Sequence, residues 1–185
     1  ARTAVLLRGA QMALLSEQLV PLSPRSSVTL PVAPRVSASV APDGSTGILR
    51  AAGLKAQVIP LAVSPDAPDS TAPRLSLEEG RFLLEFPSFG RRAWVGWLVV
   101  WDPARVRRTP AIRPLTVTTR TVRCRPDQAQ AFRIGWGAGQ DSLVVYRSLA
   151  RPDLRTFLGQ QTTDRFLMGW FDASGDLKPL LKIPS

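Results

Sequence analysis

The sequence predicts a mainly β protein, an antiparallel β-sandwich or barrel-like domain preceded by an N-terminal helix and a Pro-rich extended arm. Three observations lead to this prediction. About eight to ten short apolar runs alternate with clusters of turn residues, a spacing typical of sandwiches and barrels. The 185 residues include 17 Pro and 13 Gly, which interrupt long helices. Residues 93–101 form one run that is apolar on both faces of a strand.

The run at 93–101, AWVGWLVVW, predicts a central strand. Trp94 and Leu98 would point to one side of a sheet, and Trp97 and Trp101 to the other, because successive side chains alternate. Exposing rings of this size to water costs free energy, so both faces of the strand should be buried against other residues. We expect the middle strand of a two-layer β structure. The alternative is a strand that contacts a partner, with Trp97 and Trp101 as interface residues.

Residues 3–20 predict an amphipathic helix, with Thr3 as its N-cap and Pro21 at its end. We expect this helix to pack within the protein or its assembly. We expect no membrane span, because the apolar run is short and contains Arg8 and Glu17. The candidate interface residues are the apolar stripe of this helix: Val5, Met12, Leu15 and Leu19.

The five Pro residues between positions 21 and 42 predict an extended or polyproline-like arm. Residues 28–30 and 36–40 are short enough to be edge strands, and Asp43-Gly44 is a turn signal. Such an arm either lies on its own domain or adds a strand to a neighbour's sheet. We therefore divide the chain into residues 1–46, the helix and the arm, and residues 47–185, the antiparallel β domain.

From Gly47 onward, short apolar runs alternate with tight turns. Runs at 48–51 and 56–63 flank Gly53. Residues 115–124 predict one continuous strand of Val and Thr, with Arg120, Val122 and Cys124 on one face. Three further pairs of runs flank turn residues and predict hairpins: 74–77 with 81–86, 132–136 with 142–146, and 166–171 with 177–183.

The formal net charge is +10, and much of the excess lies in one segment. Between Trp101 and Arg125, seven Arg accompany a single acid, Asp102. This predicts either a solvated basic rim or a surface for an anionic partner, such as nucleic acid or an acidic polysaccharide. The seven candidate anion-binding or partner-binding residues are Arg105, Arg107, Arg108, Arg113, Arg120, Arg123 and Arg125.

The sequence contains no His, which removes the usual general base, the commonest metal ligand and every Ser–His or Cys–His pair. We therefore expect no enzyme activity, no catalytic residue, no cofactor, no metal and no small-molecule substrate. The single Cys cannot form an internal disulfide. We expect Cys124 to be a small buried hydrophobe. The alternative is a reactive thiol, favoured by the flanking Arg123 and Arg125.

Four runs in the C-terminal third share a pattern: YRSLA at 146–150, RTFLGQ at 155–160, FLMGWF at 166–171 and LLKI at 180–183. With Asp102-Pro103 after the Trp run and PLTV at 114–117, they resemble a group of uncharacterised bacterial proteins of the planctomycete type. The resemblance covers residues 55–185. It implies a bacterial β-rich module and carries no activity, cofactor or site residue with it.

The functional hypothesis is a non-catalytic structural or protein-interaction module, a subunit of a larger assembly that binds other proteins or copies of itself. The contacts would come from the predicted helix, the arm and the Arg-rich face. The alternative is a binder of an anionic polymer through the Arg-rich face, whose affinity would fall steeply with salt. We expect a cytoplasmic location.

Overall fold

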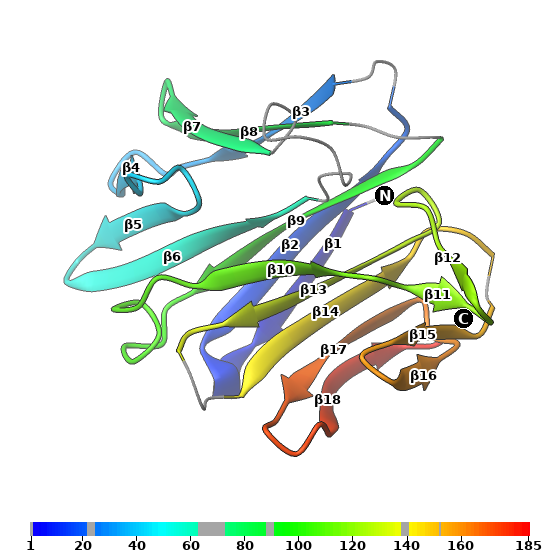
Figure 1. The fold of residues 1–185 in the computed structure, drawn as a ribbon. Helices are drawn as coiled ribbons and strands as arrows, with labels where there is room; N and C mark the ends of the chain where they lie inside the picture. The colour runs from blue at the N-terminus through cyan, green and yellow to red at the C-terminus, as the bar shows by residue number, and fades with distance from the viewer. Residues whose placement is uncertain (1, 22–24, 63–72, 88–90, 138–140, 152) are drawn as a thin grey trace. The chain divides into compact units, whose positions relative to one another are not determined.

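The computed structural model describes residues 2–21, 25–62, 73–87, 91–137, 141–151 and 153–185 (Figure 1). Regular structure in these ranges is strand, apart from one short 3₁₀ turn, Arg8–Ala10. All strand pairs there are antiparallel, so the prediction of a mainly β, antiparallel protein is confirmed. The chain divides into two compact units: unit 1, Ala1–Arg107, and unit 2, Arg108–Ser185.

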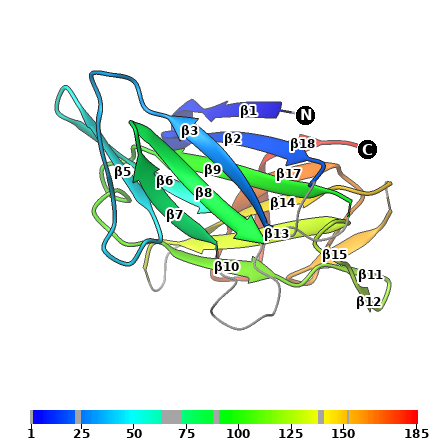
Figure 2. The same cartoon turned by 90° about the horizontal axis from the view of Figure 1, so that it is seen from above.

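Unit 1 consists of a six-stranded sheet with the order β1-β2-β9-β6-β5-β4 and a three-stranded sheet with the order β3-β8-β7. The three-stranded sheet lies in front of the six-stranded one in Figure 2. The bounds are β1 (Arg2–Leu7), β2 (Met12–Leu19), β3 (Arg25–Pro31), β4 (Ser37–Val40), β5 (Gly47–Ala51), β6 (Leu54–Leu61), β7 (Arg74–Glu78), β8 (Arg81–Pro87) and β9 (Ala93–Val100).

The core of unit 1 contains side chains from both of its sheets. Val58, Val95 and Trp97 of the six-stranded sheet form one buried cluster with Phe82 and Leu84 of the three-stranded sheet. Strand β9 lies between β2 and β6, and seven of its eight residues are buried. The prediction that the Trp-rich run is a central strand is therefore confirmed.

The predicted N-terminal helix is wrong, because residues 3–20 form a strand hairpin. β1 pairs with β2 along its whole length, and Gln11 takes a left-handed conformation, with φ of 50°, in the turn between them. β2 also pairs with β9 along its whole length. Helix propensity differs by at most about 0.7 kcal/mol per ordinary residue. Burying Met12 and Leu14 in the sheet is worth about 1.5–3 kcal/mol each, which outweighs it.

The predicted arm supplies strands to both sheets of unit 1. Its two expected edge strands are present: β3 is an edge of the three-stranded sheet, and β4 is an edge of the six-stranded sheet. Residues 22–24 of the arm lie outside the described residues. The predicted boundary between residues 46 and 47 falls between β4 and β5, which pair from Val40↔Gly47 to Ser37↔Arg50.

Unit 2 consists of a five-stranded sheet, β10-β13-β14-β17-β18, and a four-stranded sheet, β12-β11-β15-β16. Tyr146 of β14 stacks on Phe157 of β15, with ring centroids 4.9 Å apart, in a buried cluster shared by the two sheets. The bounds are β10 (Ala111–Leu115), β11 (Thr118–Thr119), β12 (Val122–Arg123), β13 (Ala129–Gly135), β14 (Ser142–Ser148), β15 (Arg155–Phe157), β16 (Gln160–Thr162), β17 (Phe166–Phe171) and β18 (Leu177–Ile183).

The barrel alternative is wrong, because each of the four sheets of the described residues is open and has two edge strands. The three predicted hairpins are present as β7–β8, β13–β14 and β17–β18, although residues 138–140 of the second loop lie outside the described ranges, as does residue 63 of the predicted run 56–63. The predicted continuous strand at 115–124 is wrong. Arg120, with φ of 55°, reverses the chain between β11 and β12.

Candidate functional site

The edge strands differ in how they are protected against pairing with another chain. An edge exposes unpaired backbone N–H and C=O groups, and natural edges are blocked by charges, by Pro or by being short. In the described sheets, β3, β7, β10 and β18 carry charged residues, and three of these four also contain Pro. β4, β12 and β16 have only four, two and three residues. These seven edges are all protected in one of the expected ways.

Strand β3 has its Arg25 and Pro31 at its two ends and mostly polar residues between them, whereas the edge strand β1 is mostly apolar. Strand β1 pairs with β2 on one side, and its residues 3–7 contain neither a charged side chain nor Pro. Its charged residue, Arg2, lies at the very end of the strand and forms a 3.1 Å ion pair with Glu17 of β2. Five consecutive residues therefore present a backbone edge with no blocking side chain.

The sheet face beside this edge is apolar and exposed. Leu6 is 57% exposed, and Leu15 is 37% exposed. Ala4 lies directly opposite Leu15 in the register of β1 and β2, so Ala4, Leu6 and Leu15 share one face of the sheet. These three side chains and the backbone of residues 3–7 are called the β1 edge below.

The apolar stripe predicted for a helix is divided between two sheet faces. Val5 and Met12 lie on one face, where Met12 is fully buried and Val5 is half-buried. Leu15 and Leu19 lie on the other face, where Leu19 packs against the core of unit 1 and Leu15 is exposed. Of the four predicted interface residues, only Leu15 therefore contributes to the β1 edge with its side chain.

The two predicted interface Trp residues are largely covered. Trp97 is 3% exposed and belongs to the core of unit 1. Trp101 is half-buried just after β9, and its backbone N–H donates to the carbonyl oxygen of Gln11 over 3.0 Å. Both residues thus have structural roles within unit 1.

The seven predicted Arg residues belong to two different units. Arg105 and Arg107 are in unit 1, and the other five are in unit 2. Arg105 and Arg125 form ion pairs with neighbouring Asp side chains, and Arg108 donates to a backbone carbonyl oxygen over 3.1 Å. These contacts hold three of the seven guanidinium groups against their own unit.

The remaining Arg residues of unit 2 are exposed in two places. Arg113 lies on the edge strand β10. Arg120 and Arg123 are exposed on the hairpin formed by β11 and β12. This hairpin is where the structure brings predicted anion-binding residues together within one element.

A shallow pocket of unit 1 gathers cations that the sequence analysis did not single out. Arg50 of β5 lies directly opposite Lys55 of β6, and Ser37 of β4 lies on the other side of Arg50. Arg35 also lines the pocket, and no acidic residue of the described chain does. Like charges directly opposite on neighbouring strands repel each other. The sequence signal was the symmetric placement of these two cations around the turn at Ala52-Gly53.

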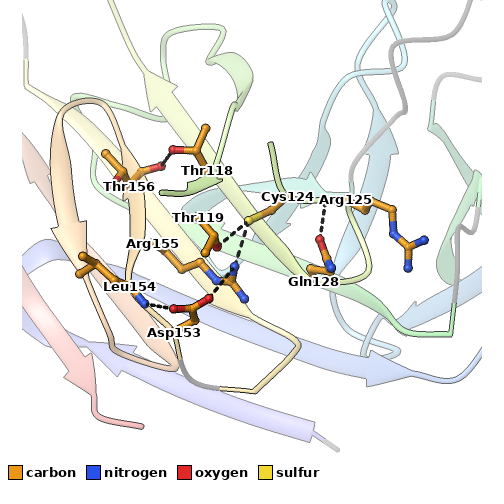
Figure 3. Close-up of polar contacts among 9 residues, drawn as sticks. All are labelled: Thr118, Thr119, Cys124, Arg125, Gln128, Asp153, Leu154, Arg155 and Thr156. Atoms are coloured by element: carbon orange, nitrogen blue, oxygen red, sulfur yellow. Dashed lines mark hydrogen bonds and ion pairs between the residues drawn. The ribbon is translucent and has the colours of Figure 1, made fainter. Parts of the chain in front are cut away.

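Unit 2 contains a polar cluster around its cysteine, drawn in Figure 3. Cys124 Sγ lies 3.2 Å from Nη1 of Arg155 and 3.4 Å from Oγ1 of Thr119. Arg155 Nη1 also lies 3.9 Å from a carboxylate oxygen of Asp153. Arg155 is only 6% exposed, whereas Cys124 is partly exposed. A partly exposed cysteine is therefore held by a buried cationic donor.

Strand register explains this arrangement. Thr119 of β11 lies opposite Arg155 of β15, and Arg155 in turn lies opposite Thr162 of β16, so the three side chains share one face. The backbone N–H of Cys124 donates to the carbonyl oxygen of Val117 over 2.8 Å. This hydrogen bond holds Cys124 next to the start of β11, close to these three side chains. Sequence reasoning missed Arg155 because 31 residues separate it from the cysteine.

Two buried polar atoms of the same region make no hydrogen bond to the described residues: Nε of Arg155 and the hydroxyl of Tyr146. Tyr146 is fully buried, in the apolar cluster against which Cys124 packs. Burial raises the pKa of Tyr146 above its ordinary value of 10.0, so its hydroxyl stays protonated at neutral pH. Nε of Arg155 is therefore a buried donor that makes no hydrogen bond to the described residues.

No protein-family model, no curated protein and no solved structure matches this chain. The resemblance to planctomycete-type bacterial proteins therefore stays a prediction. Among the described residues, no helix is long and apolar enough to cross a membrane. In the same ranges, no three acidic or cysteine side chains are grouped as the ligands of a metal ion would be.

Proposed function

We propose that this protein is a non-catalytic interaction module that assembles through the β1 edge, and that its partner is a second copy of the same chain. The observation that carries the proposal is the run of residues 3–7 on an edge strand, which is uncharged, free of Pro and mostly apolar, with Leu6 exposed. Strand addition at such an edge is a common mode of protein recognition.

A second copy fits the β1 edge because the edge is self-complementary. Two antiparallel β1 strands related by a two-fold axis normal to the sheet keep the same face on the same side. Leu6 of one copy then lies beside Ala4 of the other, and Leu15 of each copy lies one strand further in. The pairing joins two exposed apolar patches into one and satisfies the unpaired backbone groups of both edges.

Replacing Leu6 with Lys tests this assembly. Leu6 is 57% exposed in the single chain, so Leu6→Lys should leave folding nearly unchanged but place two positive charges at the centre of the paired edge. We expect wild type to dimerise with increasing concentration in sedimentation-velocity experiments. The variant should raise the dissociation constant at least about tenfold, which corresponds to about 1.4 kcal/mol.

The matched control is Leu54→Lys, the same change at another exposed Leu of the same sheet, which is 71% exposed beside the turn between β5 and β6. It adds the same charge and should leave dimerisation unchanged. A wild-type protein that stays monomeric at its highest soluble concentration would contradict the proposal. Equal weakening by both variants, or a dimer that dissociates steeply with added salt, would point to net charge instead of strand pairing.

A second candidate function is binding of an anionic polymer, and the row of Arg50 and Lys55 favours it. Two cations held directly opposite one another, with Arg35 beside them, repel unless an anion lies between them. A phosphodiester or sulfate group would supply that charge and accept hydrogen bonds from the guanidinium groups. We therefore propose the pocket of unit 1 as the anion site under this second candidate function, whereas the sequence alone suggests residues 105–125.

Two substitutions test which of these two locations binds the anion. With a single-stranded oligothymidine as probe, Arg50→Gln should weaken binding about threefold to tenfold in fluorescence anisotropy and reduce the slope of log K against log salt by about one. Arg113→Gln removes an exposed Arg of the sequence-predicted set on β10 and should have little effect. The reverse order of effects would favour the 105–125 segment, and the absence of salt-dependent binding would exclude both locations.

A further inference from the structure

The cysteine cluster of unit 2 carries an inference that goes beyond assembly. Arg155 is 6% exposed, and a buried guanidinium is costly unless an opposite charge compensates it. The nearest carboxylate oxygen, on Asp153, is 3.9 Å from Nη1, and Asp153 itself is 50% exposed. The sulfur of Cys124 is closer, at 3.2 Å. The sulfur of Cys124 is therefore a closer partner of the buried guanidinium than the exposed carboxylate is.

We infer that Cys124 is a reactive thiol, a modification site that hydroperoxides oxidise to the sulfenate, with Arg155 as its positioning residue. Cys124 is partly exposed, and its sulfur accepts a hydrogen bond from the buried guanidinium of Arg155 over 3.2 Å. A cation beside a cysteine that solvent can reach is typical of reactive thiols. Thr119 Oγ1 lies 3.4 Å from the sulfur, and either atom can be the donor of this hydrogen bond.

The chemistry balances with the hydroperoxide as the oxidant. The thiolate attacks the terminal oxygen of the hydroperoxide, an S–O bond forms and the O–O bond breaks. Sulfur loses two electrons. The departing alkoxide or hydroxide then takes up the proton of the OH group that was transferred to sulfur. The products are the Cys124 sulfenate and an alcohol or water. The sulfenate oxygen is an anion, and Nε of Arg155, which makes no hydrogen bond to the described residues, is a donor available to it.

The cation that contacts the sulfur is Arg155, whereas the sequence suggested the flanking Arg123 and Arg125. Arg125 directly follows Cys124, but its guanidinium lies 3.0 Å from a carboxylate oxygen of Asp127 and is well exposed. Its charge is therefore compensated and screened by solvent. Arg155, distant in sequence and almost fully buried, is the cation that contacts the sulfur.

Oxidation kinetics of the full-length chain test the inference, since Cys124 is the single cysteine. Protein treated with hydrogen peroxide is trapped with a cyclic 1,3-dione, which is selective for sulfenic acid, and is followed by intact mass. We expect wild type to react at least about tenfold faster than Arg155→Met, because a charge-assisted hydrogen bond to sulfur is lost. Arg155→Lys should restore part of the rate, and the matched control Arg125→Met should leave it unchanged.

A second measurement distinguishes the effect of the Arg155 charge on Cys124 from a structural effect of the substitution. The ratio of alkylation rates for anionic iodoacetate and neutral iodoacetamide should be higher in wild type than in Arg155→Met, because the two reagents differ mainly in charge. Should Arg155→Met fail to fold, Thr119→Val removes the hydroxyl that bonds to the sulfur at nearly constant volume and should slow oxidation severalfold. The inference is overturned if wild type reacts no faster than free cysteine, or if Arg125→Met slows oxidation as much as Arg155→Met does.

Discussion

Leu84→Ala should lower the free energy of unfolding of unit 1 by about 2–5 kcal/mol. Leu84 is fully buried on β8, the middle strand of the three-stranded sheet, and belongs to the cluster that contains side chains from both sheets. The truncation removes apolar contacts and leaves a cavity that a close-packed core fills only in part. Urea unfolding followed by Trp fluorescence measures the loss as a lower midpoint at constant slope.

The matched control for this truncation is Leu54→Ala. Leu54 is 71% exposed on β6, so the same atoms are removed from a position that already contacts water. We expect a change within about 0.5 kcal/mol. Similar losses in the two variants would contradict the location of the core between the two sheets of unit 1.

Gly169→Ala should cost about 1–3 kcal/mol in unit 2, because the added methyl group has no space. Gly169 lies on β17 beside the irregularity in its pairing with β18. A Cβ built there would lie 2.7 Å from the backbone oxygen of Lys178 and 3.1 Å from Cα of Pro179. These are backbone atoms, so the contact cannot be relieved by turning a side chain. Thermal unfolding monitored by circular dichroism should show a lower midpoint.

Gly135→Ala is the control for Gly169→Ala. Gly135 ends β13 in the same sheet, and the nearest atom to its added Cβ is Ser142 Oγ at 3.9 Å, an ordinary contact. Substitution there should be neutral or raise the stability by a few tenths of a kcal/mol, about what the lower entropy of the unfolded chain gives. An unfolding midpoint that falls equally in both variants would show that backbone crowding at Gly169 is not the cause.

The hairpins were predictable because their signals are local. Glu79 and Gly80 have positive φ, at 46° and 72°, in a two-residue turn between the strands, and Gly80 is the residue type that this turn favours at its second position. The central position of β9 was predictable for a similar reason, since a strand without a polar face needs cover on both sides.

The N-terminal hairpin was mispredicted because its strand character depends on distant residues. Residues 12–19 contain good helix formers, and their strand conformation is stabilised by pairing with β9, about eighty residues later in the chain. One local signal was available: Val5, Leu7, Met12 and Leu14 lie on one face of the hairpin, with Gly9 in the turn. An alternating pattern on both sides of a Gly is typical of a hairpin.

The candidate sites were predictable only in part, because the sequence shows which residues are charged but not which of them become neighbours in the sheets. The Arg count identified a basic protein, yet Arg105 and Arg125 are held in ion pairs. The cations that face each other, Arg50 and Lys55, become neighbours through strand register. The contact between Cys124 and Arg155 likewise depends on the pairing of β11 with β15.

The position of β9 also has a consequence for synthesis in the cell. β2 lies next to β9 in the sheet, but the ribosome makes residues 12–19 long before residues 93–100. At about 5–20 residues per second, the N-terminal hairpin waits roughly 4–16 s for its neighbour. Throughout that delay, two apolar strands protrude from the translating ribosome with one flank unoccupied. Nascent chains on the same messenger RNA could pair through these unpaired strand edges, so chaperone binding prevents the most aggregation in this interval.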